Sequence, residues 1–177
     1  SKEVYTSNVS VVNQKPFVFN MSIRRNLDFV DKNIKHQIEA CKKAGIHDFI
    51  ETLPDGYNTI LRENGSNVSG GQKQMISIAR TILSDAEVLL FDDITTSLDP
   101  DTAKLVPKLI DNLKKDHTII MITKKPELMK TADKIVVLDH GKINDIGTHK
   151  QLTQTNEIYQ MLQSRKSPSK IGVFDNV

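Results

Sequence analysis

The sequence has little of what a secreted, membrane-spanning or nucleic-acid-binding protein requires. Its single cysteine, Cys41, cannot form an internal disulfide, which favours a reducing compartment. Its longest apolar runs have only four residues, whereas a membrane-spanning helix needs about 20. Charge of one sign is also scarce, because 24 basic residues balance 22 acidic ones and leave a net charge of +2. That balance excludes the broad basic surface of a dedicated nucleic-acid binder.

The first residues, Ser1 to Tyr5, include neither an initiator methionine nor the apolar segment of a signal peptide. We therefore expect no secretion signal, and we expect the chain to be a piece of a longer protein. Its 177 residues, of which 38% are hydrophobic and 26% charged, have the composition of a folded domain. No internal repeat or low-complexity segment interrupts it.

The first half of the chain predicts one strand followed by helices. Residues 9–12 form a short apolar run that predicts a strand, and residues 22–84 contain no strand pattern. Within that region, Asp31 is expected to cap a helix that Gly45 ends. The helix has its apolar positions at Ile34, Ile38, Cys41 and Ala44. Two further helices are expected at about 47–52 and 70–84.

The second half alternates strands with helices, an order that predicts an α/β fold with a parallel sheet. The apolar runs at 87–91 and 118–122 are typical of strands buried on both faces. Pro107 should break or kink the helical pattern of 101–115. The remaining expected elements are strands at 134–138 and 142–146 and helices at 126–131, 148–153 and 156–163.

A serine followed by two glycines begins the helix at residue 70, within the segment Val68-Ser69-Gly70-Gly71-Gln72. The glycines allow a ligand close to the backbone, and a helix N-terminus offers unpaired N–H groups and the positive end of its dipole. The Ser69 hydroxyl adds a donor. This combination suits the terminal phosphate of a nucleotide. Taken alone, the same residues fit a serine N-cap beside a flexible glycine hinge better than a phosphate site.

Two carboxylates, Asp92 and Asp93, follow the apolar strand 88–91. Ligands of α/β sheets bind at the carboxyl ends of the strands, where these two side chains should emerge. One carboxylate can hold Mg²⁺ through water, and the next can orient or deprotonate an attacking water. An acid-capped surface turn is the alternative, but the glycine-rich helix start that precedes this strand favours the chemical interpretation.

Together these motifs resemble the nucleotide-binding domain of ATP-binding-cassette (ABC) transporters of the exporter type. The resemblance runs from about residue 9 to residue 163 and rests on several motifs in the family's order. They are the Q-loop at Gln14, the exporter segments Leu53–Thr59 and Glu63–Gly65, the signature Val68–Gln72, Walker B at Val88–Asp92, the D-loop Ser97-Leu98-Asp99 and the switch position at Lys124.

The resemblance implies the C-terminal part of a P-loop NTPase-like core with a parallel sheet, into which a helical signature subdomain is inserted. The implied boundaries are residues 1–21 for the end of the first core segment, 22–84 for the helical subdomain and 85–163 for the α/β core. Residues 164–177 are expected to be a mobile tail.

The family's functional roles can be transferred to matching positions of this chain. ATP and Mg²⁺ are the implied cofactors, with Gln14 and Asp92 serving Mg²⁺, Asp93 the attacking water and Lys124 the γ-phosphate. Residues Val68, Ser69, Gly70, Gly71 and Gln72 would cover a nucleotide held on a partner's P-loop, and Asp99 would communicate across that dimer. The implied partners are a second ABC ATPase domain, identical or different, and a transmembrane domain, but no nucleic acid.

Three departures from the family pattern concern catalysis. The sequence contains no Gly-x-x-x-x-Gly-Lys-[Ser/Thr] P-loop, which in the family lies before the Q-loop, so the chain by itself is expected to be inactive. The catalytic glutamate is replaced by Asp93, which is one methylene shorter. The switch histidine is replaced by Lys124, which can pair with phosphate but has no neutral tautomer that both accepts and donates.

The sequence therefore predicts the ATP-binding and ATP-hydrolysing part of an exporter at the cytoplasmic face of the cell membrane. One alternative is the weakly hydrolysing partner of a heterodimeric exporter, and another is a regulatory ABC module without transport. Phe17 and Phe19 fit either the core or a contact with the membrane domain, and Glu63 fits either a solvated loop or an exporter contact. The five histidines and Cys41 show no metal-ligand spacing.

Overall fold

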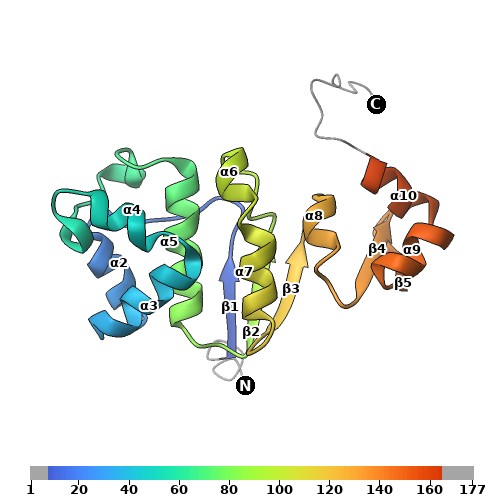
Figure 1. Cartoon of the computed structure of the whole chain (residues 1–177), viewed down its shortest axis with the longest axis horizontal. Coiled ribbons are helices and arrows are strands. Elements are labelled where there is room, and N and C mark those ends of the chain that lie inside the picture. Colours follow the sequence, from blue (N-terminus) through green and yellow to red (C-terminus); the bar gives the residue numbers. More distant parts are fainter. Residues whose placement is uncertain (1–7, 165–177) are drawn as a thin grey trace. The chain divides into compact units, whose positions relative to one another are not determined.

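The computed structural model describes residues 8–164, and the chain forms two compact units, Ser1–Thr123 and Lys124–Val177. Of the expected tail, residues 165–177 lie outside the described part. The confirmed α/β class rests on the first unit, which combines a parallel sheet with a group of helices (Figure 1).

Three parallel strands form the sheet of the first unit in the order β1-β2-β3. They are β1 (Val9–Val12), β2 (Val88–Asp92) and β3 (Thr118–Ile122). Val12 pairs with Phe91, and Asp92 pairs with Ile122, so all three strands end at one edge. That edge is where the sequence places the Q-loop and the Walker B carboxylates.

The outer strand β3 corrects one expectation. Its side chains alternate between exposed and half-buried, and Ile120 and Ile122 are 55% and 64% exposed. The apolar run predicted a strand buried on both faces, but β3 is the last strand of the described sheet and one of its faces is open. Strand β2 differs from the expectation in the same way: Leu89 and Phe91 are fully buried, whereas Val88 and Leu90 on its other face are only half-buried.

Four α-helices occupy the segment between β1 and β2. They are α2 (Ile23–Asp28), α3 (Ile34–Ala44), α4 (His47–Thr52) and α5 (Gly70–Leu83), with short 3₁₀ turns at Gly56–Asn58 and Glu63–Gly65. The strand-type pairing described within residues 22–84 is a single bridge between Ser22 and Ile60. Helix α5 contacts both α3 and β1, so it joins the helical group to the sheet.

Helix α3 begins later than the sequence predicts. Its N-cap is Asn33, whose side chain accepts from the Lys35 N–H, whereas Asp31, two residues earlier, accepts from the Asn33 N–H. Gly45 ends the helix as expected, with a left-handed φ of 78°. The buried face contains Gln37 rather than Ile34, because the Gln37 amide donates to the Asp28 carboxylate and the Asp31 carbonyl.

Pro107 breaks the helical pattern after the D-loop, as expected. The structure has a short α6 (Pro100–Ala103) and then α7 (Val106–Leu113), and Pro107 lies in the first turn of α7. Proline is tolerated in a first turn because its missing N–H would have no partner there.

The second unit contains a hairpin in place of further parallel strands. Strands β4 (Ile135–Asp139) and β5 (Lys142–Gly147) pair with each other in antiparallel fashion and form a separate sheet. The sequence predicts both strands correctly, but β4 does not extend the parallel sheet. Helices α8 (Pro126–Met129), α9 (His149–Thr155) and α10 (Glu157–Ser164) complete the unit, whose core is formed by Met129, Val137, Leu152 and Tyr159.

Candidate functional site

Gln14 and Asp93 meet at the carboxyl edge of the sheet. Gln14 follows β1 and Asp93 follows β2, and the Gln14 Nε2 donates to Asp93 Oδ2 at 3.2 Å. The Asp93 N–H donates to the Ile122 carbonyl at 2.9 Å, and its φ of +43° turns the chain away from the sheet. Parallel pairing therefore brings together two predicted site residues that lie 79 positions apart.

Thr96 also holds the Asp93 carboxylate, a contact that the sequence analysis missed. Its hydroxyl donates to Asp93 Oδ2 at 2.8 Å, while the Thr96 N–H donates to the Asp93 carbonyl at 3.3 Å. The spacing Asp-x-x-Thr is a sequence signal for such a turn. With the Gln14 amide and the Thr96 hydroxyl on the same oxygen, the carboxylate is held in one orientation.

The predicted phosphate-binding segment begins α5 with a capping box. The Ser69 Oγ accepts from the Gln72 N–H at 3.1 Å, and the Gln72 Oε1 accepts from the Ser69 N–H at 2.8 Å. The N-cap interpretation of Ser69 is therefore correct. It leaves the phosphate interpretation open, because a hydroxyl that accepts one hydrogen bond can still donate another.

The two glycines are not explained by packing within this chain. Neither Gly70 nor Gly71 has a left-handed φ. A Cβ at Gly70 would lie 3.4 Å from the Ser97 carbonyl oxygen, and one at Gly71 would lie 3.6 Å from Asp99 Oδ2, both ordinary contact distances. A single Cβ would therefore fit at either position, which favours a requirement from outside the chain, such as a closely approaching ligand.

The D-loop contacts both the Q-loop and the glycine pair that begins α5. The Ser97 hydroxyl donates to the Gln14 carbonyl at 3.4 Å, and the Ser97 carbonyl oxygen faces Gly70 and Gly71. Asp99 caps α6, accepting from the Thr102 hydroxyl at 2.6 Å and from the Asp101 and Thr102 N–H groups. The hydrogen bond from the Thr102 side chain lowers the pKa of the Asp99 carboxyl below its usual value.

The residues at this edge fit part of a magnesium–nucleotide site. Asp92 is exposed at the end of β2, and the carboxylate and amide oxygens of Asp92 and Gln14 are the type of ligand that Mg²⁺ prefers. Within residues 8–164, no three His, Cys, Asp or Glu side chains are placed to hold a metal. Mg²⁺ usually keeps several waters and takes phosphate oxygens as ligands, so one or two protein side chains are enough to hold it. Lys124 is exposed at the start of the second unit, so its approach to the γ-phosphate stays a prediction.

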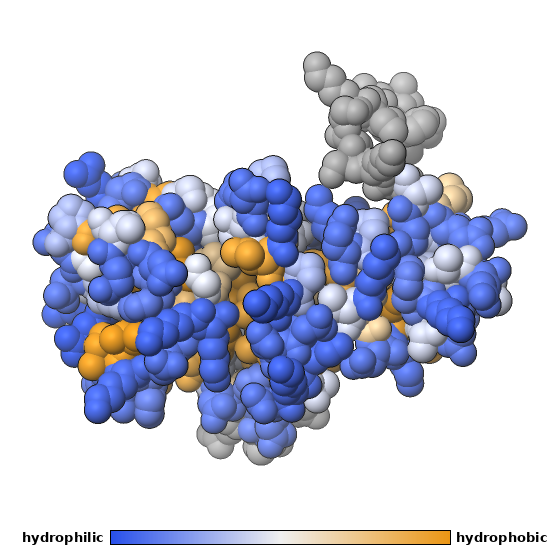
Figure 2. All heavy atoms as spheres, in the orientation of Figure 1, coloured by the Kyte–Doolittle hydropathy of each residue, from blue (hydrophilic) through white to orange (hydrophobic). Residues whose placement is uncertain are grey.

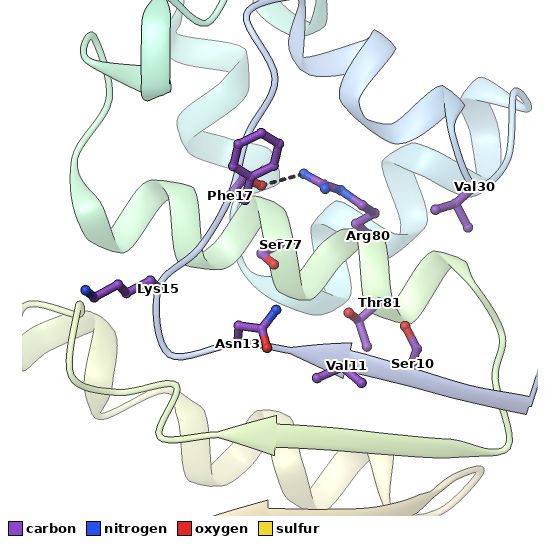
Figure 3. Close-up of a pocket in the computed structure, with 9 residues that line it drawn as sticks. All are labelled: Ser10, Val11, Asn13, Lys15, Phe17, Val30, Ser77, Arg80 and Thr81. Atoms are coloured by element: carbon purple, nitrogen blue, oxygen red, sulfur yellow. Dashed lines mark hydrogen bonds between the residues drawn. The ribbon is translucent and has the colours of Figure 1, made fainter. Parts of the chain in front are cut away.

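An aromatic surface follows the Q-loop. Phe17 and Phe29 are 57% and 62% exposed, and both rings contact Phe19, with centroid separations of 4.8 Å and 4.7 Å. The core interpretation of Phe17 and Phe19 is therefore wrong. Arg80 of α5 supports this surface, donating from Nη2 to the Phe17 carbonyl at 3.0 Å (Figure 3). Burial lowers the pKa of the Arg80 guanidinium.

Beside this aromatic surface is a hollow of about 310 Å³ between β1 and α5. In Figure 3 its lining comes from the Q-loop strand, from α5 and from Val30. The Asn26 side chain holds the aromatic segment in place, because it donates to the Phe19 carbonyl and accepts from the Phe19 N–H. Glu63 is exposed in its 3₁₀ turn, and neither interpretation of it is tested.

Comparison with known proteins places the chain among ABC transporters. Residues 1–96 match the ABC transporter family model. The chain is 39% identical over 160 residues to the ATP-dependent lipid A-core flippase of Haemophilus influenzae (strain 86-028NP), a match that covers 89% of this chain and 27% of the flippase. It is 40% identical over 161 residues to ABC transporter B family member 2 of Dictyostelium discoideum, covering 90% of this chain and 12% of that protein.

The fold agrees with a solved exporter. A bacterial Atm1-family ABC exporter with ATP bound matches 93% of this chain with a TM-score of 0.87 and 30% identity, and the match covers 30% of that exporter chain. This chain thus spans about a quarter of the flippase and less than a third of the exporter. None of the described helices is long and apolar enough to cross a membrane. The chain belongs to the ABC transporter family and matches the ATPase domain of its exporter-type members.

Proposed function

We propose that the chain is the ATP-binding and ATP-hydrolysing part of an ABC exporter and that it couples hydrolysis to transport across a membrane. The observation that carries the proposal is the meeting of three distant segments at one sheet edge. Gln14 contacts Asp93, and Ser97 contacts both Gln14 and the glycine pair that begins α5. Such an edge is the usual ligand position in α/β folds.

Each residue has a defined task in this proposal. Asp93 accepts a proton from the attacking water, and the bonds from Gln14 and Thr96 fix the direction of its carboxylate. Gln14 and Asp92 would hold Mg²⁺, which supplies charge neutralisation at the phosphates. Lys124 would contact the γ-phosphate as a point charge.

The signature segment and the D-loop would act across a dimer. The N–H groups at the start of α5 and the Ser69 hydroxyl would bind the phosphate of a nucleotide held by a second ABC ATPase domain. Asp99 would contact that second domain. The aromatic surface of Phe17, Phe19 and Phe29 would receive the transmembrane domain, because exposed aromatic side chains are favoured at protein interfaces. This arrangement would place the chain at the cytoplasmic face of the membrane.

The test is steady-state phosphate release by the full transporter that carries this chain. Asp93→Asn removes the proton acceptor but keeps the size of the side chain, so turnover should fall by about 100-fold or more while ATP binding remains. Asp116→Asn, an exposed position after α7, is the matched control. Unchanged turnover in Asp93→Asn would refute the assigned role.

A second candidate is the weakly hydrolysing partner of a heterodimeric exporter. Asp93 and Lys124 favour it, because both hydrolytic positions differ from the family pattern. In that case the unaltered transporter would bind ATP at this site with little turnover there, and Asp93→Asn would leave the total rate unchanged. A mutation of the partner's own catalytic carboxylate would then abolish the activity.

A further inference from the structure

A groove runs between the C-terminal end of α3 and the segment from α6 to α7. None of the residues that line it belongs to the Q-loop. The groove has a volume of about 330 Å³, and Met75 of α5 also lines it. Figure 2 shows hydrophobic surface near the start of α7, bordered by hydrophilic residues on both sides. Clefts of this size can take a few side chains of a ligand.

All of the charged residues that line this groove are basic. Lys42 and Lys43 come from the last turn of α3, and Lys108 comes from α7, whereas no carboxylate lines the groove. The chain as a whole is nearly balanced in charge. Lys42 pairs with Glu39 at 3.1 Å, but Lys43 and Lys108 are exposed and have no ion pair among the described residues.

Helix stabilisation does not account for this set of lysines. Cations near a helix C-terminus stabilise the helix dipole, which explains Lys42 and Lys43 on α3. Lys108 lies in the first half of α7, where a cation gains nothing from the dipole. Its position opposite the α3 lysines instead makes the groove a site of positive potential.

The groove also offers apolar contact area. Leu105, which precedes α7, is 59% exposed, while Met75 and Leu109 beside it are almost completely buried. A ligand that fits both features carries acidic groups next to apolar side chains. An amphipathic helix with glutamates beside its leucine face has this chemistry, and such helices bind in grooves of this kind.

Other anionic partners fit less well. Binding to anionic lipid typically uses four to eight basic residues, whereas three lysines line this groove. Nucleic-acid sites combine a basic track with aromatic side chains for stacking, and the lining contains no aromatic residue.

We propose that the α3–α7 groove is a docking site for an acidic amphipathic helix of a partner protein. Carboxylates of that helix pair with Lys43 and Lys108, and its apolar face covers Leu105. The proposal is independent of ATP hydrolysis, so its outcome and that of the catalytic proposal can be told apart.

The experiment measures binding of a synthetic helical peptide to the isotope-labelled chain by NMR. The probe is a peptide of about 15 residues, long enough to be helical in water, with leucines on one face and flanking glutamates. A peptide with lysine in place of every glutamate is the control. We expect amide shift changes in the last turn of α3 and in α6 and α7 with the acidic peptide only, and weaker binding at high salt.

The variant Lys43→Glu/Lys108→Glu should raise the Kd about tenfold or more, because it places like charges opposite the peptide. Lys134→Glu/Lys142→Glu changes two exposed lysines of the second unit and should leave the Kd unchanged. Leu105→Ser should weaken binding without removing its salt dependence. Equal affinity in the two double variants, or binding to phosphatidylserine vesicles but not to the peptide, would overturn the proposal.

Discussion

Asp93 and Lys124 are the two residues at which this chain departs from the catalytic pattern of the family it matches. The Gln14 amide and the Thr96 hydroxyl both donate to one oxygen of the Asp93 carboxylate. An aspartate reaches about 1.5 Å less far than a glutamate, and a misplacement of about 1 Å can cost on the order of 100-fold in rate.

The variant Asp93→Glu/Lys124→His should therefore raise the ATPase turnover of the full transporter by roughly tenfold or more, which corresponds to about 1.4 kcal/mol of barrier. Both residues would act on one water and one phosphate, so the single changes should not be additive. Phosphate release by the parent, the two single variants and the double variant measures this. If the double variant were slower than the parent, the site would be adapted to Asp and Lys.

Cys41 is a residue whose chemistry is set by burial. Its side chain is completely buried in α3, and burial raises the pKa of the thiol from 9.0 to about 11. At pH 8 the folded chain should therefore contain about 100-fold less thiolate than the unfolded chain. We expect Ellman's reagent to react at least that much more slowly with the folded chain than in urea.

The same shift predicts a loss of stability at alkaline pH. The raised pKa means that the folded state favours the protonated thiol, so this contribution is present below pH 9 and is lost between pH 9 and about 11. Cys41→Ser should show no Ellman reaction and a shallower fall in stability over that range. Equal reaction rates with and without urea would show that Cys41 is accessible.

At the scale of elements, α5 connects the helical group, the sheet edge and the signature segment. Its capping box satisfies N–H groups at both Ser69 and Gln72. Ser69→Ala removes the cap and should lower the free energy of unfolding by about 1 kcal/mol. Urea denaturation of the chain measures this directly.

Ser69→Asp separates the structural role of this residue from the proposed phosphate contact. Aspartate is as good an N-cap as serine, so the stability should stay near that of the parent. Its negative charge would repel a phosphate at the same position, so ATPase turnover of the full transporter should fall. If Ser69→Asp kept full turnover, Ser69 would be only a cap.

Sequence patterns predict elements better than they predict burial. The helix of α5 and the end of α3 at Gly45 are both predicted correctly, because each depends on residues that are close together in the sequence. The buried Gln37 could not be predicted, because its partners on Asp28 and Asp31 lie before the helix, where its periodicity carries no information. The exposure of β3 likewise depends on what covers the strand rather than on its own residues.

At the scale of the whole molecule, strands with exposed apolar side chains should cause the isolated chain to self-associate. Ile120 and Ile122 are more than half exposed on the outer strand β3, and the β4–β5 hairpin exposes Leu138 and Ile143 by 66% and 62%. Exposed apolar edge strands favour pairing with other chains. Light scattering after size exclusion should show oligomers of the isolated chain that increase with concentration.

Ile120→Lys should reduce this association, because a charge on an edge strand opposes pairing. Met161→Lys adds the same charge at an exposed position of α10 and should leave the association unchanged. A chain that stays monomeric at high concentration would contradict the prediction.

The isolated chain should also bind Mg-ATP only weakly. Its 177 residues contain no P-loop motif, which supplies the lysine and the backbone N–H groups that hold the β- and γ-phosphates. The signature segment alone offers one helix N-terminus and the Ser69 hydroxyl. Calorimetry should give no micromolar affinity, and a micromolar Kd would contradict this prediction.

The sequence by itself determined the order of the elements, the parallel α/β class and the membership in the ABC family. Periodicity, caps and the order of motifs can all be read along the chain without knowing which residues meet in space. Tertiary structure decided which of these residues meet. Only the parallel pairing of β1 with β2 brings Gln14 to Asp93, and only the turn after β2 places Thr96 on the same carboxylate and Ser97 against Gly70. It also decided that Phe17, Ile120 and Lys108 face outward, because exposure is a property of how elements pack and is not encoded in the residue itself.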